Sequence, residues 1–230
     1  MVVQELGAMG VKPGLDIMDA TTPEGKILYQ AWQTCLDKTA GPSRVFYGLE
    51  EDNPLKIWGF FDWDTVQQHE EFAVKDGADV VKDISKICTH GEMTKHIQMV
   101  PSSDVFQSPL TEVFLAYFPT DFPEAEKDKA TAQLRDILDK SFGGCSDVAG
   151  VAHSWSVEND WPVRREKQVV TGQSGSALVG FVGWTSDVAQ KVFRQTAAYK
   201  EAVAEISGLT GVVSLDIVSL RCKHMKRSNE

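Results

Sequence analysis

The chain has 230 residues, of which 42% are hydrophobic, and this composition supplies enough apolar material for a packed core and excludes a disordered chain. Its net charge of −10 argues against a nucleic-acid-binding protein, because a phosphate-binding surface needs clustered Lys and Arg. The longest apolar run, 177–184, is far shorter than the roughly 20 residues of a membrane-spanning helix, and no N-terminal signal pattern is visible. We therefore expect a soluble, cytoplasmic protein that binds neither nucleic acid nor membrane.

The cysteines and the missing motifs limit the chemistry further. The four cysteines are widely spaced, without a Cys-x-x-Cys pair, which favours reduced thiols over a zinc site or a disulfide framework. There is no His-Glu-x-x-His, dinucleotide-binding or P-loop pattern. We expect neither a metal nor a bound organic cofactor. The basic cluster at 221–227 is interpreted as a solvated tail.

In chain order, the first half predicts a strand, a helix, two strands, a helix and a strand. Thr22, Pro23 and Glu24 open the first helix, since Pro is tolerated in the first turn and a carboxylate suits the positive helix end. A turn at 51–54 joins the two middle strands into a hairpin. The predicted elements are strand 2–9, helix 22–38, strands 44–50 and 55–63, helix 64–87 with an interruption near Gly77, and strand 95–100.

The second half predicts the same order. Its predicted elements are strand 111–118, helix 124–141, strands 148–157 and 176–184, helix 186–206 and strand 211–220. The segment 101–109, which begins and ends with Pro, is the natural linker, so we divide the chain into domains 1–103 and 104–230. An insertion around 164–175 forms a hairpin, and we interpret its segment from Gly172 to Gly175 as a flexible loop that could act as a lid.

The two halves are an internal repeat. Gly59, Phe60 and Trp63, with the later Phe72, match residues 180, 181, 184 and 193 at one constant displacement. Each half has the strand-helix-strand-strand-helix-strand order of a ferredoxin-like unit. Large apolar residues point both ways in strands 57–61 and 178–182, so both faces of each sheet need cover. Helices cover one face, and the sibling sheet is the simplest cover for the other. The predicted fold class is therefore α+β, with two tandem ferredoxin-like βαββαβ repeats that form an intramolecular, pseudo-dimeric α/β barrel.

The pattern resembles the dimeric α/β-barrel superfamily, especially antibiotic-biosynthesis-monooxygenase-like domains. Their signature is a strand ending in Trp, a short polar turn, and a helix with a His and a later Phe. Trp63, His69 and Phe72 look like this signature, whereas the second copy carries Gln190 in place of the His. The resemblance implies a fused pair of domains and a substrate held between sheet and helices. It also implies proton transfer by a His, Tyr or carboxylate, or cofactor-free oxygenation.

Polar residues that differ between the copies are the candidate catalytic residues. A second echo, Glu50-x-Asp52-x-Pro54 against Glu158-x-Asp160-x-Pro162, aligns His153 with Val45 of the first copy. His153 lies in an apolar strand, and apolar neighbours lower the pKa of an imidazole. It is the candidate base, although a core histidine bonded to backbone is the alternative. Asp62, at a strand end, is either solvated or a buried general base, and His69 is either an exposed helix residue or a second catalytic group.

Further residues are candidates for binding. Tyr47 and Trp155 occupy equivalent strand positions and could wall a pocket, although barrel packing is the alternative. His96 lies on a polar strand face that could line a cavity. The candidate substrate-binding residues are Tyr47, Trp155, His96, Phe61 and Tyr117. Glu5 and Glu112 stand at matching points in the two first strands and are interpreted as structural partners for backbone or Arg, and the repeated Trp63 and Trp184 as core.

The leading hypothesis is a cofactor-independent enzyme that acts on an apolar, oxygenated, polyketide-like molecule. The chemistry would be cyclisation, isomerisation or dehydration. One alternative is a cofactor-free monooxygenase of phenol or anthrone substrates. The other is a non-catalytic ligand-binding or stress-response barrel, which predicts an interior without a pocket of roughly 300 Å³ or more. Exposed strand edges leave a homodimer open.

Overall fold

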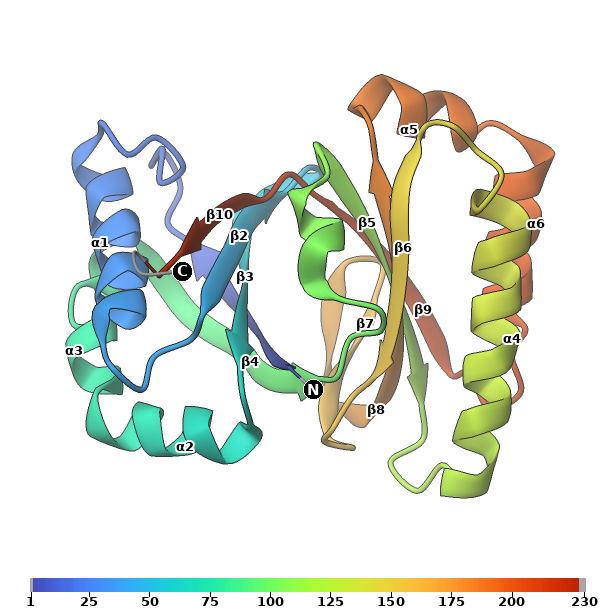
Figure 1. The fold of residues 1–230 in the computed structure, drawn as a ribbon, viewed down its shortest axis with the longest axis horizontal. Coiled ribbons are helices and arrows are strands. Elements are labelled where there is room, and N and C mark those ends of the chain that lie inside the picture. Colours follow the sequence, from blue (N-terminus) through green and yellow to red (C-terminus); the bar gives the residue numbers. More distant parts are fainter. Residues whose placement is uncertain (1, 228–230) are drawn as a thin grey trace. The chain divides into compact units, whose positions relative to one another are not determined.

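The structure, a computed structural model, describes residues 2–227 and divides the chain into two compact units (Figure 1). The first unit takes in the residues up to His96 together with those from Lys223 on, and the second runs from Ile97 to Cys222. The repeat boundary at 103/104 stays a prediction, because repeats in sequence and compact units in space need not share their ends.

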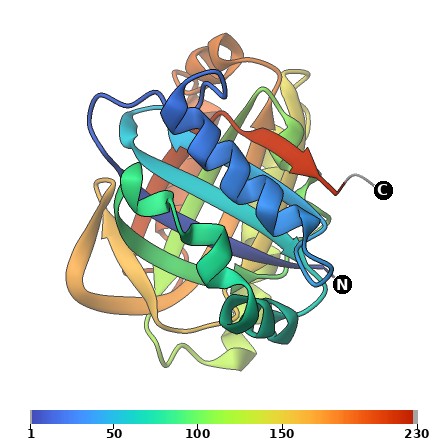
Figure 2. The same ribbon diagram turned by 90° about the vertical axis from the view of Figure 1, so that its left-hand side faces the viewer.

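The first unit is an antiparallel sheet with helices on one face. Figure 2 shows α1 and the α2–α3 segment lying over the strands. The strand order is β4-β1-β3-β2, and β10 pairs with β2. The elements are β1 (Val3–Val11), α1 (Pro23–Asp37), β2 (Arg44–Glu50), β3 (Asn53–Trp63), α2 (Val66–Lys75), α3 (Gly77–Val81), the 3-10 turn η1 (Ile84–Lys86), β4 (Cys88–Ile97) and β10 (Lys223–Lys226).

The second unit has the same plan. Its strand order is β9-β5-β8-β6, with β7 paired to β8. The helices α4 and α6 contact each other beside this sheet (Figure 1). The elements are the 3-10 turn η2 (Ser103–Gln107), β5 (Leu110–Phe118), α4 (Glu124–Phe142), β6 (Val148–Trp155), β7 (Trp161–Arg165), β8 (Gln168–Trp184), α5 (Asp187–Phe193), α6 (Ala197–Ser207) and β9 (Ser214–Leu220).

Both units are therefore ferredoxin-like, and the α+β class with two tandem βαββαβ repeats is confirmed. In each unit the last strand pairs with the first, the first with the third, and the third with the second. The register also repeats: Gly7 faces Gly59 across β1 and β3, and Phe114 faces Gly180 across β5 and β8. The closure of the two halves into one barrel stays a prediction.

Helix α1 begins where the sequence predicts. Thr22 has an extended backbone, and its Oγ1 accepts a hydrogen bond from the Gly25 amide at 3.0 Å, with Pro23 in the first turn. Leu28 and Trp32, four residues apart, then pack on the sheet of the first unit. The helix contributes one wall of the space between helices and sheet.

Several predicted boundaries move. The helix predicted at 64–87 breaks near Gly77, as expected, into α2, α3 and η1, and the one at 186–206 breaks into α5 and α6. Of the strand predicted at 95–100, residues 95–97 are the end of a longer strand, β4, that already begins at Cys88 and ends at Ile97. Polar residues such as Thr89 and His90 hid the beginning of that strand, because an exposed strand segment needs no apolar pattern.

The predicted inserted hairpin is confirmed, but the flexible loop predicted at Gly172 to Gly175 is wrong. Residues 161–165 and 168–175 form a paired hairpin, in which Gly175 lies opposite Trp161 inside β8. Glu166 and Lys167 make its tight turn, with φ of 51° and 65°. Gly172 and Gly175 therefore lie within β8, where Gly172 has a left-handed φ of 75°. A role of this hairpin as a lid stays a prediction.

The C-terminal basic cluster is largely exposed, as predicted, but it is not a free tail. Residues 223–226 form β10, which pairs with β2 in the first unit. The guanidinium of Arg227 then donates hydrogen bonds to the carbonyl oxygens of Leu36 at 3.2 Å and Gly41 at 2.6 Å. The strand pairing and these hydrogen bonds hold residues 223–227 in place, although their basic composition by itself is typical of a solvated segment. Among the helices of residues 2–227, none has the length and apolar character needed to cross a membrane.

Candidate functional site

The first unit contains a cavity of about 510 Å³ between its sheet and its helices. Strands β1, β3 and β4 line one side, and α1, α2 and α3 line the other. A cavity of this volume falls in the range of small-molecule sites. It also contradicts the filled interior that a purely structural barrel would have.

Small residues on both sides create the room. Gly7 and Gly59 face each other in the β1–β3 ladder and leave the sheet bare at the cavity. A Cβ atom at Gly7 would meet nothing within 4 Å. On the helical side, the cavity is lined by Ala73 of α2 and Gly77 of α3. The space therefore follows from missing side chains at facing positions.

The walls are aromatic and buried. Trp32 of α1 meets Phe61 of β3 edge to face, with ring centroids 5.0 Å apart. Trp63 lies 5.1 Å from Phe72 of α2, again between centroids. All four rings line the cavity, and each is at most 6% exposed. Such walls suit a flat apolar or aromatic ligand.

The polar groups gather at one part of this cavity. The Trp63 indole donates a hydrogen bond to Glu5 Oε2 at 2.9 Å, and His69 Nε2 lies 3.3 Å from the same oxygen. The other ring nitrogen of His69, Nδ1, lies 2.8 Å from His96 Nε2. Glu5, His69 and His96 thus form a continuous chain of titratable groups. The side chains of Glu5 and His69 are only 12% and 13% exposed, and His96 is 5% exposed.

Local sequence explains this convergence. Glu5 alternates with Gly7 and Met9 on the helix-facing side of β1, whereas Leu6 and Ala8 between them are more deeply buried on the other side. Thr65 caps α2 by accepting a hydrogen bond from the amide of residue 68 at 3.0 Å. His69 therefore lies one turn into the helix, with Phe72 and Ala73 three and four residues later on the same face.

Burial changes the acidity of Glu5. Loss of hydration raises its pKa from 4.5 to about 7, although the Trp63 hydrogen bond and the nearby His96 oppose that rise. A carboxyl group with this pKa exchanges its proton near neutral pH, as a general acid or base must. His69 connects it to His96, and which nitrogen carries the hydrogen depends on the tautomer. The arrangement can accept a proton in the cavity and pass it along two imidazoles.

The remaining polar residues of the cavity are not cationic. Glu92 of β4 lines the cavity and forms an ion pair with Lys56 of β3. Burial raises the pKa of the Cys35 thiol, and the nearby Glu5 adds to that rise, so the thiol stays protonated. Among the described residues that line the cavity, none is Lys or Arg. The cavity therefore offers proton transfer but no partner for an anionic ligand.

The structure brings three of the predicted site residues together. His69 and Phe61 line the cavity, and His96 contacts His69. Tyr47 packs in the same apolar core, 6.3 Å from Trp32 between ring centroids, and burial raises the pKa of its phenol. Asp62 is separate from this group, because alternation along β3 turns it to the opposite face from Phe61. There it pairs with Arg44 at 2.8 Å and accepts a hydrogen bond from Gln4 at 2.8 Å.

The other three predicted site residues belong to the second unit. His153 lies in β6, and its backbone exchanges two hydrogen bonds with Val100. Partial burial lowers the pKa of its imidazole, and the charge of Arg135 lowers it further. Trp155 donates a hydrogen bond to Thr131 at 2.7 Å, and Tyr117 is fully buried in β5. None of these residues lines the cavity of the first unit.

Sequence reasoning missed the role of Glu5, which was expected to bind backbone or Arg because Glu112 stands at the matching point. Trp63 was expected to be core because it repeats, and it does belong to the buried core, where its indole also binds Glu5. The signal available in the sequence was the neighbour of Glu5 on its strand. Glu5 lies two residues before Gly7 on the same strand face, and the second copy has Phe114 at the position of Gly7. A carboxyl group beside a missing side chain indicates a cavity.

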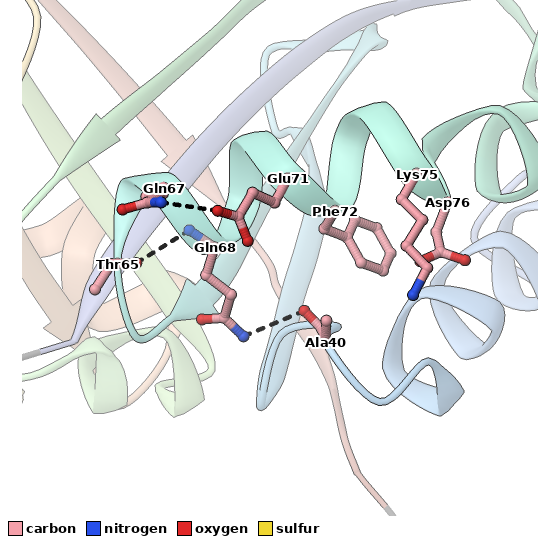
Figure 3. A pocket seen from close by; sticks show the side chains of 8 residues that line it. All are labelled: Ala40, Thr65, Gln67, Gln68, Glu71, Phe72, Lys75 and Asp76. Atoms are coloured by element: carbon pink, nitrogen blue, oxygen red, sulfur yellow. Dashed lines mark hydrogen bonds between the residues drawn. The ribbon is translucent and has the colours of Figure 1, made fainter.

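A smaller hollow of about 290 Å³ lies beside α2 (Figure 3). Its polar side chains largely bond one another: Gln67 donates to Glu71 at 2.8 Å, and Gln68 donates to the Ala40 carbonyl at 3.2 Å. We assign it no chemistry. Within residues 2–227, no group of three or more His, Cys, Asp or Glu is arranged to hold a metal ion.

No protein family and no curated protein matches this sequence. Solved structures share its fold at low identity. An anthrone oxidase-like protein is 12% identical over 99% of this chain and 94% of its own, with a TM-score of 0.68. A proposed monooxygenase from Lactobacillus acidophilus is 12% identical over 98% and 96%, with a TM-score of 0.57. A variant chlorite dismutase from Candidatus Nitrospira defluvii, in complex with cyanide, is 8% identical over 96% and 90%, with a TM-score of 0.53. These likenesses cover nearly the whole chain and show the fold alone.

Proposed function

We propose that the chain is a cofactor-independent enzyme that removes a proton from an uncharged, apolar, oxygenated molecule in the cavity of the first unit. Products of cyclisation, isomerisation or dehydration would follow from the resulting carbanion or enolate. One observation carries the proposal: the chain of Glu5, His69 and His96 ends in an aromatic cavity of about 510 Å³.

Glu5 is the proposed base. A base is most effective when its pKa lies near the working pH, and burial raises the pKa of Glu5 to about 7. The Trp63 indole fixes one carboxylate oxygen at 2.9 Å and so holds the group in place. His69 lies beside that oxygen and lines the same cavity, so it can return a proton to a different atom of the ligand. This assignment moves the role of base from His153 to Glu5.

The walls indicate the class of substrate. Trp32, Phe61 and Phe72 offer ring faces and edges to a planar molecule, and the lining carries no Lys or Arg among the described residues. A carboxylate or phosphate would meet Glu5 and Glu92, and Lys56, the cation that pairs with Glu92, is not among the lining residues. A neutral ketone, anthrone or phenol with a weakly acidic hydrogen fits both conditions.

Oxygenation is the second candidate, and the likeness to an anthrone oxidase-like protein favours it. Removal of a methylene proton from anthrone gives a carbanion that dioxygen can oxidise. One O₂ is then consumed per anthrone, one of its oxygen atoms becomes the new carbonyl, and the other leaves as water with the two methylene hydrogens. The first step, proton removal by Glu5, is common to both candidates.

Exchange of the anthrone methylene hydrogens in D₂O without oxygen, followed by NMR, tests this shared step. We expect Glu5→Gln to slow the enzymatic exchange by about 10²–10⁴-fold, the usual contribution of a positioned base. His69→Gln and His96→Ser introduce the residue types of Gln190 and Ser219, which form the corresponding contact in the second unit, and should slow exchange without loss of fold. His153→Ala is the matched control and should leave the rate unchanged.

Two outcomes would refute the proposal. If Glu5→Gln exchanged at the wild-type rate, the base would be elsewhere. If anthrone bound but the wild-type protein exchanged no faster than buffer, the cavity would bind without catalysis. Oxygen uptake in air with anthrone then separates the two candidates, because only oxygenation consumes O₂ in proportion to anthrone.

A further inference from the structure

The second unit retains the framework of the polar site. Glu112 occupies the same ladder position as Glu5: it faces residue 182 on β8, the repeat equivalent of residue 61 on β3. Trp184 corresponds to Trp63 in the repeat. Gln190 donates a hydrogen bond to Ser219 at 2.8 Å, as His69 contacts His96 in the first unit. In each copy, therefore, a helix residue contacts a residue of the last strand beside the equivalent carboxylate, Glu5 or Glu112.

The two carboxylates differ in their hydrogen-bond partners and in their access to a cavity. Arg194 Nε donates to Glu112 Oε1 at 2.7 Å, and the Tyr199 hydroxyl donates to the same oxygen at 2.7 Å. Arg194 also reaches Ser219 at 3.0 Å through Nη2. Glu112 is 0% exposed. These side chains cover in the second unit the carboxylate that lines a cavity in the first.

Two substitutions between the copies, together with Tyr199, account for the difference. Arg194 directly follows Phe193, the repeat equivalent of Phe72, so it stands where the first copy has Ala73. Phe114 faces Gly180 across the ladder, where the first copy has Gly7 facing Gly59. Phe114 is fully buried, and its ring lies 6.3 Å from that of Tyr199 between centroids. Two of the positions that make room in the first unit, Gly7 and Ala73, therefore have equivalents with large side chains in the second.

We propose that the second unit is a plugged copy of the site, and that Ala73 and Gly7 are the specificity-determining residues that keep the first copy open for one ligand per chain. The inference rests on the proposed function only in placing the ligand in the first cavity. It deepens that function by fixing which half acts and how many molecules bind. An Arg at position 73 would place a guanidinium beside Glu5, as Arg194 lies beside Glu112.

The test introduces into the first unit the Arg side chain that covers the carboxylate in the second. Equilibrium binding of anthrone to the full chain without oxygen should saturate at one molecule per chain. Ala73→Arg should weaken that binding at least 100-fold, whereas Ala73→Ser, which adds little volume and no charge, should bind within about threefold of wild type. In the second unit, the neutral pair Glu112→Gln with Arg194→Met avoids an unpaired buried charge. It should leave the affinity of the first site within about twofold.

A second readout needs no ligand. Carbon-13 NMR of labelled glutamate carboxyls should follow Glu5 titrating near neutral pH in the wild type and below its ordinary range in Ala73→Arg, because a guanidinium stabilises the ionised form. Two anthrone molecules per chain, or a folded Ala73→Arg protein with wild-type affinity, would overturn the inference. A pKa of Glu5 that is the same in Ala73→Arg and in the wild type would also overturn the inference, even if anthrone proves not to bind. Binding that follows these expectations without any proton exchange would refute the proposed function and leave the inference standing.

Discussion

Replacement of Glu5 by Gln should stabilise the protein at alkaline pH and leave its stability at acid pH nearly unchanged. Burial raises the pKa of Glu5 from 4.5 to about 7, so the folded state binds its proton more tightly than the unfolded state does. The contribution of Glu5 to stability is therefore fully present below about pH 4.5 and is lost as the pH rises through 7. Each pKa unit corresponds to about 1.4 kcal/mol, so the loss by pH 8 is about 3 kcal/mol.

Glutamine keeps an oxygen that can accept the Trp63 indole hydrogen bond, and it cannot ionise. Urea unfolding at several pH values between 4.5 and 8.5 measures the effect as a difference between variant and wild type, which removes the contribution of all other groups. We expect this difference to be near zero at pH 4.5 and to reach about 3 kcal/mol in favour of the variant at pH 8.5. The side chain is only 12% exposed, so solvent screening leaves most of the effect in place.

Glu112→Gln is the matched control, because it makes the same change at the equivalent strand position. It should destabilise the protein on the order of 2 kcal/mol at neutral pH, since Arg194 and Tyr199 lose a charged partner. Opposite signs for the two variants would establish that the neighbours, and not the strand position, decide how each carboxyl behaves. A Glu5→Gln variant whose stability follows the wild-type pH dependence would refute the reasoning.

Three other predictions concern rate, volume and the C-terminus. The rate of anthrone exchange should rise with pH and level off above about 7, because the ionised form of Glu5 is the base, and a rate that falls over this range would contradict the assignment. Gly7→Val should weaken anthrone binding about tenfold while it raises stability by about 0.5–1 kcal/mol, measured by titration and urea unfolding, since its side chain points into empty space on a strand. Arg227→Ala should lower the free energy of unfolding by about 2 kcal/mol at constant anthrone affinity, because the carbonyls of Leu36 and Gly41 lose a charged donor.

Local patterns predicted the elements of the fold well. The internal repeat gave the topology of both units, and the capping residues Thr22 and Pro23 gave the beginning of α1. The repeat could not reveal β10, because a four-residue basic strand has no apolar pattern and forms only by pairing with β2 far along the chain. The hairpin at 161–175 was predicted, but its second strand was interpreted in part as a loop, because it carries Gly and polar residues that equally suit a loop.

The candidate site was predicted in part. His69, His96 and Phe61 were identified, the first from the family-like position on its helix and the second from a polar strand face. Glu5 was not, because a buried Glu in both copies indicates a shared structural role when only the two residues are compared. Their neighbours carry the distinction. Gly7 and Phe114 lie two residues away on the same strands, but Ala73, Arg194 and Tyr199 come from segments far away in the sequence.

A buried carboxylate must either bind a cation or become protonated, because an unpaired charge in an apolar interior is too costly. The second unit takes the first solution: Arg194 binds Glu112, and the carboxylate gains stability but loses contact with any ligand. The first unit takes the second solution, since Ala73 offers Glu5 no charge and His69 offers it a partner that can itself exchange a proton. A carboxyl group in that state is a weaker contributor to folding at neutral pH and a better base. The loss of stability at Glu5 and its proposed chemistry therefore have the same physical cause. A variant such as Ala73→Arg should restore the stability only by removing the ability of Glu5 to act as a base.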